Sequence, residues 1–252
     1  MYLLRKGPFL QGGLELKGYK SELVRASLKI GALRLSVQKP FLWASGYYMP
    51  VYTDNRIFLS EAGYRGMIAD AFISMMKSME IKAEVIAGTA TAGIPHAAAL
   101  ADKLSLPLTY VRSSSKDHGL GNRIEGLPAP HSGWNSGVRG FSGRRVVLIE
   151  DLVSTGGSSI SALKAVREAD GIIEHCLSIF SYGFPEAEAA FSSLSPVCTL
   201  SSIITYGDLV RGAENEGYIT AAEAESLREW RGDPFAWGKK NGFPRVKKGA
   251  SL

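Results

Sequence analysis

The stretch VVLIEDLVSTGGSS, residues 146–159, decides the fold class because it joins a buried strand to a loop suited to an anion. Four apolar residues, typical of a strand inside a sheet, run into the adjacent acids Glu150 and Asp151. Small hydroxyl residues and glycines follow, and glycines let several backbone N–H groups converge on one point. A helix expected over 158–169 would add partial positive charge at its first turn.

Ligands of open α/β sheets bind at the carboxyl ends of the strands. The order of residues therefore favours a phosphate monoester on this loop, with the hydroxyls of a sugar bound by the two acids. The alternative is a strand end whose acids are solvated and whose loop is only a tight turn. A nucleoside triphosphate loop would need a lysine after the second glycine, and neither that lysine nor a G-x-G-x-x-G motif is present. A kinase and a dinucleotide-dependent enzyme are thus disfavoured.

Apolar strand patterns alternate with helical patterns on both sides of this stretch. The sequence predicts strands over 83–88, 107–112, 144–151 and 172–182, and helices over 93–104, 158–169 and 185–194. Alternation of this kind is typical of parallel βαβ units. We therefore expect an α/β fold whose sheet is covered by helices on both faces.

The flanking parts of the chain carry weaker patterns. Further helices are expected over 21–30, 60–79 and 221–230, and strands joined by a turn over 41–56. Ser21 and Ser60 are the expected N-caps of the first two helices, and Thr220 with Glu223 forms a capping box for the last. Apolar residues of the second helix, many of them methionines, recur at helical spacing, which we interpret as a core face.

The composition is that of an ordinary globular protein, with 252 residues of which 45% are hydrophobic and 21% charged. The net charge of +5 suits a polyanionic small molecule as well as weak contact with nucleic acid. Cys176 and Cys198 have no metal-ligand spacing, which favours a reducing compartment. We see neither an apolar stretch of membrane-spanning length nor a signal-peptide pattern, so a cytoplasmic protein is expected.

The boundaries of the domain follow from shifts in composition. Residues 1–20 are expected to form an extension, 21–232 a single domain and 233–252 a basic, irregular tail. The polar residues 113–126 and the Gly/Pro/Ser-rich insert 127–143 together make an unusually long connection. A connection of that length in a compact domain indicates either function or disorder.

The opening stretch resembles the 5-phosphoribosyl 1-diphosphate (PRPP) motif of type I phosphoribosyltransferases. The segments FLWASGYYMPVYTDNR, IAGTATAGIPHAAALADKLSLPLTYVR and KDHGLGNRIEG, in this order, are similar to those of the orotate phosphoribosyltransferase family, in a bacterial subset. The resemblance runs from about Ser21 to Trp230. It implies a type I phosphoribosyltransferase-like fold, with a mostly parallel sheet flanked by helices and a small hood subdomain built largely from the N-terminal part.

The resemblance also implies a reaction. Members of this family are pentosyltransferases that move the phosphoribosyl group of PRPP onto orotate, giving orotidine 5′-monophosphate and pyrophosphate on the route to UMP. It implies Mg²⁺ carried by PRPP, with no direct protein ligand. Two carboxylates are in any case few for a protein-only Mg²⁺ site. The implied assembly is a homodimer whose active-site loop reaches into the neighbouring subunit, without a nucleic-acid or membrane partner.

The site residues implied by the resemblance fall into two groups. The expected PRPP ligands are Arg112, Lys116, His118, Glu150, Asp151, Leu152, Val153, Ser154, Thr155, Gly156, Gly157 and Ser158. Lys116, His118 and Asp151 are the expected catalytic residues. Ser154, Arg56 and Tyr52 are expected at orotate, although Tyr52 could equally be a core aromatic residue and Arg56 a surface charge.

Two neighbouring positions are given secondary roles. Gly93 is expected to allow close approach of the backbone to pyrophosphate. His96 is expected to pack inside its helix and to bind no ligand.

Some positions depart from better-known members of the family. Ala44, Ala92 and Ser113 stand where others carry lysine, and Ser181-Tyr182 stands where others carry Asp-Arg.

Two other functions stay open: a phosphoribosyltransferase for a purine or uracil, and a PRPP-sensing regulator that binds RNA or DNA. The YVR…KDHG segment favours orotate, and the modest charge with no added nucleic-acid-binding domain disfavours the regulator.

Overall fold

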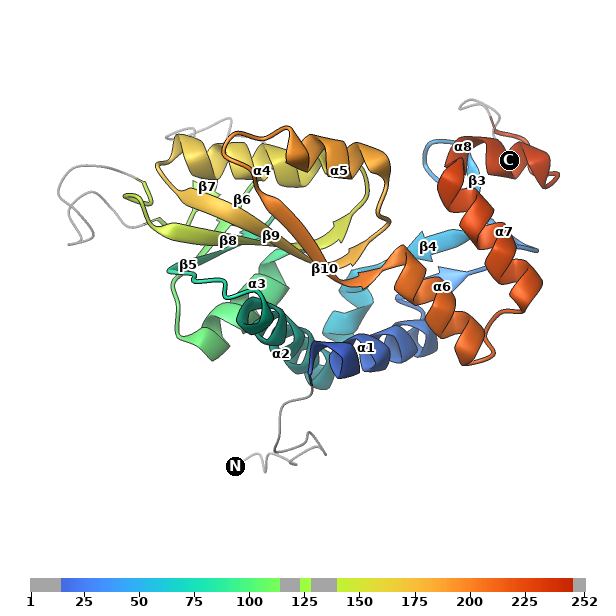
Figure 1. The fold of residues 1–252 in the computed structure, drawn as a ribbon, viewed down its shortest axis with the longest axis horizontal. Coiled ribbons are helices and arrows are strands. Elements are labelled where there is room, and N and C mark those ends of the chain that lie inside the picture. The colour runs from blue at the N-terminus through green and yellow to red at the C-terminus, as the bar shows by residue number, and fades with distance from the viewer. Residues whose placement is uncertain (1–14, 114–122, 128–139, 247–252) are drawn as a thin grey trace.

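The computed structural model describes residues 15–113, 123–127 and 140–246 (Figure 1). Its centre is a six-stranded sheet in the order β10-β9-β8-β5-β6-β7. The strands are β5 (Val85–Thr89), β6 (Leu108–Val111), β7 (Ile124–Glu125), β8 (Arg145–Val153), β9 (Ile172–Ser181) and β10 (Thr199–Thr205). All neighbours pair in parallel except β6 and β7. The expected mostly parallel α/β sheet is confirmed.

Helices cover both faces of this sheet (Figure 1). One face carries α1 (Leu16–Ile30), α2 (Ala62–Ser78) and α3 (Ile94–Leu104), and the other carries α4 (Gly157–Glu168) and α5 (Pro185–Ser192). The side chains of β8 alternate between these layers: Val147 and Ile149 pack with the first group, Val146 and Leu148 with the second. This division explains why the strand is apolar at consecutive positions.

A smaller hood subdomain lies beyond one end of the sheet, at the right of Figure 1. Its strands form two antiparallel pairs, and helices follow from the C-terminal part of the chain. The strands are β1 (Leu33–Leu35), β2 (Phe41–Leu42), β3 (Tyr48–Met49) and β4 (Val51–Thr53), and the helices are α6 (Tyr206–Asn215), α7 (Ala221–Gly232) and α8 (Pro234–Lys240). The hood therefore joins the expected N-terminal strands to C-terminal helices.

The C-terminal segment holds the β2–β3 hairpin in place. Helix α8 contacts β3, and its Trp237 is buried. The backbone N–H of Val246 donates to the carbonyl of Gly46 at the hairpin turn (2.8 Å). A Cβ on Gly46 would overlap the carbonyl oxygen of Val246, so this contact requires glycine there.

Several sequence predictions of element boundaries were wrong. Helix α1 begins at Leu16, so Ser21 lies inside it and is not its cap. A 3-10 helix, η1 (Asn55–Ser60), occupies the residues before α2, which makes Glu61 the N-cap in place of Ser60.

Other elements had no counterpart in the sequence analysis. The helix expected to be the last, α7, is followed by α8 inside the tail that was expected to be irregular. Strand β10 and helix α6 were not predicted at all, although Thr205 and Asp208 form a capping box at the start of α6.

Two further observations concern the chain as a whole. Within the described ranges, no helix is both long and apolar enough to cross a membrane. Both cysteines, Cys176 in β9 and Cys198 before β10, are free thiols buried in the protein. Burial raises the pKa of the Cys198 thiol to about 12 and that of Cys176 well above its ordinary value.

Candidate active site

The acidic pair lies inside strand β8, because β8 continues to Val153. On one side β8 pairs with β9 as far as Val153 and Ser181, whereas on the other side its last partner in β5 is opposite Ile149. From Glu150 onward the β5 side of β8 thus has no neighbouring strand. We call residues 150–153 on this side the open edge of β8.

Two side chains replace the missing strand near the open edge. The carbonyls of alternate residues in a strand point to the same side. The Thr89 hydroxyl donates to the carbonyl of Ile149 (3.2 Å), and the Asn55 amide Nδ2 donates to the carbonyl of Asp151 (2.6 Å). These two bonds fix the backbone that carries the acids.

Gly93 leaves the room that this arrangement needs. A Cβ on Gly93 would lie 2.5 Å from the carbonyl oxygen of Ile149 and 2.6 Å from the Thr89 hydroxyl. The packing of the β5–α3 turn against β8 therefore already requires glycine here. Its expected approach to pyrophosphate stays a prediction.

Glu150 is held inside the protein. Only 5% of its surface is exposed. Its carboxylate accepts from the Ser159 hydroxyl (3.1 Å) and from the backbone N–H of Asp151 (3.0 Å). Burial raises the pKa of Glu150 to about 7, with a further rise from the Asp151 carboxyl and an opposing effect of Thr89. Both oxygens already have partners, so Glu150 anchors the strand end.

Asp151 is the more accessible member of the pair. It is half-buried, and desolvation raises the pKa of its carboxyl, while the charge of Arg56 acts in the opposite direction. A half-buried carboxyl on an open strand edge can accept hydrogen bonds from the hydroxyls of a sugar. The structure thus separates two acids that the sequence treated alike.

The loop after β8 has the form expected for an anion site. Gly156 has φ +84°, a conformation that favours glycine, and α4 begins directly after it. Thr155, Gly157 and Ser158 are exposed, and no side chain of the described residues caps the helix. The first N–H groups of α4 are therefore available to an anion, as the sequence predicted.

Of the two hood-side residues predicted to contact orotate, Tyr52 lies on strand β4 and Arg56 on η1, which follows it. The guanidinium of Arg56 binds both carboxylate oxygens of Asp54, with Nε–Oδ1 2.7 Å and Nη2–Oδ2 2.9 Å, although 67% of its side chain is exposed. The ring of Tyr52 is half-buried, and the guanidinium carbon of Arg34 lies 4.6 Å from its centre. One face of Tyr52 and the fork of Arg56 are thus already occupied within the protein.

The expected pyrophosphate loop is described only at its two ends. Arg112 follows β6 and pairs with Glu125 at 3.6 Å. Arg123, which the sequence analysis overlooked, donates to the Ser161 hydroxyl on α4 (2.9 Å) and to the carbonyl of Arg112 (3.1 Å). Lys116 and His118 lie outside the described residues.

The family departure at Ser181-Tyr182 has a structural explanation. The Tyr182 ring is buried among aromatic side chains, and its hydroxyl is 3.0 Å from the Thr53 hydroxyl of β4. The Arg231 guanidinium of α7 donates to the carbonyls of Tyr182 and Gly183. The position where other members carry arginine is thus a buried link between sheet and hood.

His96 packs inside the protein, as the sequence analysis expected. It is buried on α3 and neither ring nitrogen has a hydrogen-bond partner within the described ranges. Burial, aided by the charge of Arg65, lowers the pKa of His96 to about 4. The imidazole is therefore a neutral part of the core.

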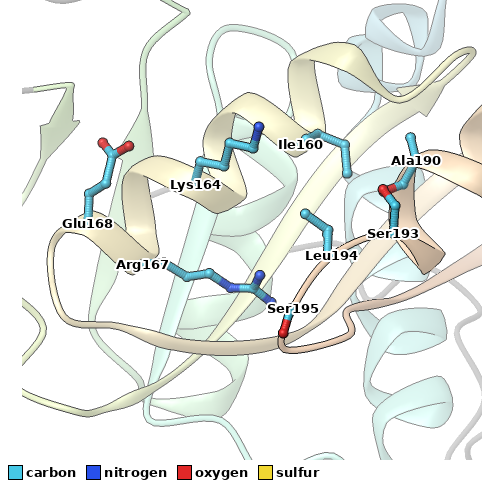
Figure 2. Close-up of a pocket in the computed structure, with 8 residues that line it drawn as sticks. All are labelled: Ile160, Lys164, Arg167, Glu168, Ala190, Ser193, Leu194 and Ser195. Carbon is cyan, nitrogen blue, oxygen red and sulfur yellow. The ribbon is translucent and has the colours of Figure 1, made fainter.

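A separate hollow of about 470 Å³ lies between α4 and α5 (Figure 2). Lys164, Arg167 and Glu168 line it, and Arg167 donates to the carbonyls of Ile173 and Pro196. Those carbonyls lie at the amino ends of β9 and β10, opposite to the end that carries Asp151. The hollow is therefore distinct from the candidate site.

The metal-binding capacity of the site is small. Within the part of the chain that the structure describes, no three His, Cys, Asp or Glu side chains gather closely enough to hold a metal ion. Glu150 and Asp151 are the nearest approach, and the oxygens of Glu150 are already hydrogen-bonded. Two adjacent carboxyls are few for a Mg²⁺ site built by these described residues alone.

Comparison with known proteins identifies the class as that of the phosphoribosyltransferases. The family model for the phosphoribosyl transferase domain matches residues 60–181. Two curated orotate phosphoribosyltransferases are close in sequence. The Staphylococcus aureus enzyme is 43% identical over 83% of this chain and 97% of its own length, and the Levilactobacillus brevis enzyme is 44% identical over 83% and 93%.

The chain therefore belongs to the orotate phosphoribosyltransferase family. Solved structures agree. The orotate phosphoribosyltransferase of Aeropyrum pernix superposes with a TM-score of 0.62 at 27% identity, over 79% of this chain and 99% of its own. The UMP synthase of Leishmania donovani, at 22% identity, shares the fold, with a TM-score of 0.67 over 86% of this chain and 43% of its own.

Proposed function

We propose that this protein transfers the 5-phosphoribosyl group of PRPP to orotate, forming orotidine 5′-monophosphate and pyrophosphate in pyrimidine biosynthesis. The observation that carries the proposal is the 43% identity to orotate phosphoribosyltransferases across 97% of their length. The open edge of β8 and the uncapped start of α4 supply the matching chemistry.

The reaction exchanges one bond at C1 of the ribose. The C1–O bond to pyrophosphate breaks, the bond from C1 to the orotate nitrogen forms, and that nitrogen gives up its proton. Positive charge develops at C1 in the transition state, so catalysis depends on positioning and on stabilising charge. The backbone amides of 152–158 hold the 5′-phosphate, and the Asp151 carboxylate accepts from ribose hydroxyls and faces the developing charge.

The leaving group needs positive charge of its own. Arg112, Lys116 and His118 are the ligands proposed for the pyrophosphate. Mg²⁺, brought in by PRPP, would neutralise part of the diphosphate charge and make it a better leaving group. A loop that closes over the pyrophosphate also excludes water, which would otherwise hydrolyse PRPP.

The acting unit proposed is a homodimer in the cytoplasm, in which the loop 113–126 serves the site of the partner subunit. A complementation assay tests this directly. Subunits with Lys116→Ala are mixed with subunits with Asp151→Asn under conditions that allow exchange. If the loop acts across the interface, one of the two sites in each mixed dimer is complete, and about a quarter of wild-type activity returns. A loop that acts within its own subunit gives no recovery.

The activity itself is tested by following the absorbance of orotate with PRPP and Mg²⁺. Uracil and hypoxanthine serve as control bases, and omission of Mg²⁺ tests the metal. We expect orotate to be consumed only when PRPP is present. Lys116→Ala should lower kcat steeply while circular dichroism and the melting temperature stay unchanged. Consumption of a control base in place of orotate would overturn the proposal.

A further inference from the structure

Asn55 begins η1, which follows the hood strand β4, and its side chain bonds the backbone of the acidic pair. Its Nδ2 donates to the carbonyl of Asp151 at 2.6 Å. The residue is 1% exposed, and its Oδ1 is buried without a hydrogen-bond partner within the described ranges. An unpaired buried acceptor costs free energy. The side chain is therefore oriented by its donor bond to Asp151.

The segment around Asn55 is held by packing and hydrogen bonds. Phe58, three residues on, is fully buried and packs edge-on against Tyr64 at 5.9 Å between ring centres. Asp54 caps η1 by accepting from the N–H of Arg56 (3.2 Å), and its own N–H donates to the carbonyl of Ala32 (2.8 Å). Asn55 thus connects the segment that follows hood strand β4 to the end of β8.

A second bond lies close by in the chain. The Thr53 hydroxyl meets that of Tyr182 at 3.0 Å, so residues 53–55 are tied both to the end of β8 and to the residue after β9. Tyr52 and Arg56, which are proposed to contact orotate, flank residues 53–55 in the same stretch of chain. Asp151 on the strand is proposed to contact the ribose.

We propose that Asn55 is a positioning residue for the transfer reaction, and this rests on the function proposed above. By holding the main chain of Asp151 from the segment that follows hood strand β4, it fixes the distance between the base-binding segment and the ribose-binding strand end. The reacting atoms must approach to about 3–3.5 Å in line for the reaction to proceed. Asn55 acts on that approach without touching either substrate.

Two substitutions at Asn55 test the proposal. Asn55→Ala removes the donor, and we expect kcat to fall roughly 100-fold, the effect of a misplacement of about 1 Å. The dissociation constant for PRPP, measured by titration calorimetry, should change much less than kcat, because the loop 152–158 proposed to hold the 5′-phosphate is untouched. A structural defect without a positioning role would lower kcat and PRPP affinity to the same extent.

Asn55→Asp supplies a signature that a packing role would not produce. The two side chains have the same shape, but an aspartic acid can donate to the Asp151 carbonyl only when it is protonated. It stands between the charges of Asp54, Arg56 and Asp151, of which only Arg56 is positive. We expect its kcat, divided by that of the wild type at each pH, to decline as the pH rises, whereas the ratio for Asn55→Ala stays flat.

Tyr206→Phe is the matched control. It deletes another buried bond from a side chain to a backbone carbonyl, that of Tyr206 to Leu227 (3.0 Å), away from the open edge. This variant should lose stability but keep kcat. If Asn55→Ala keeps wild-type kcat, or loses no more of it than Tyr206→Phe, the positioning role is wrong. Wild-type protein without orotate activity would instead refute the proposed function.

Discussion

Replacing Glu150 by glutamine should make the substrate-free protein more stable at alkaline pH and leave it unchanged at acid pH. In the folded protein, burial raises the pKa of Glu150 from 4.5 to about 7. The folded state therefore holds this proton more tightly than the unfolded chain does. The stability linked to the proton is fully present below pH 4.5 and is lost as the pH rises through 7.

The size of the effect follows from the two pKa values. The pKa of about 7 in the folded protein exceeds the ordinary value of 4.5 by about 2.5 units. One pKa unit corresponds to about 1.4 kcal/mol, so the shift amounts to about 3 kcal/mol. Glutamine is neutral at every pH and can keep the local bonds. Its carbonyl can accept from the N–H of Asp151, and its amide can donate to the Ser159 hydroxyl.

The assay is urea unfolding followed by tryptophan fluorescence, because Trp230 is fully buried. At pH 8 we expect Glu150→Gln to unfold with about 3 kcal/mol more free energy than the wild type, and at pH 4 with nearly the same. The control is Glu229→Gln, on an exposed side chain of α7, which should leave the pH dependence unchanged. A gain of equal size at both pH values, or none at pH 8, would refute the reasoning.

Four further substitutions have definite expected outcomes. Because burial lowers the pKa of His96 from 6.5 to about 4, the wild type should lose stability as pH falls between these values, and His96→Leu should lack that contribution in thermal melts at pH 4.5 and 7. Gly93→Ala, whose Cβ would meet the carbonyl of Ile149, should lower the free energy of unfolding by roughly 3 kcal/mol. Gly66→Ala, inside helix α2 with open space around it, should instead raise the free energy of unfolding by roughly 0.5 to 1 kcal/mol. Trp237→Ala should cost roughly 3 to 5 kcal/mol and expose the β2–β3 hairpin to limited proteolysis, and an unchanged digestion pattern would contradict the role of α8.

The sheet could be predicted from the sequence because its central strands, β5, β8 and β9, are nearly continuous apolar runs. Strand β10 lies at the edge, and only Ile203 and Ile204 of it are buried. That pattern is too short to indicate a strand. Helix α6 did carry a signal, since Thr205 precedes Asp208 at capping-box spacing, but the acid there is aspartate in place of the usual glutamate or glutamine.

The site was predictable where it is local and obscure where it depends on distant contacts. The loop 152–158 and the acidic pair stand together in the sequence. By contrast, Asn55 meets Asp151 across 96 residues and Thr53 meets Tyr182 across 129. No local pattern indicates either contact. The different environments of Glu150 and Asp151 were equally hidden, because they arise from where β5 ends.

The two buried cysteines can report how often different parts of this protein open. The thiolate is the form that reacts with alkylating reagents, and neither Cys176 nor Cys198 offers one while the fold is closed. Modification in the native protein therefore counts excursions to open forms, as amide exchange does. Cys176 lies in the interior strand β9, so its modification rate reports opening of the sheet. Cys198 lies just before β10, so its modification rate reports fraying at that edge. Comparing the two modification rates would show whether the edge of the sheet at β10 opens before the interior strand β9, without an engineered probe.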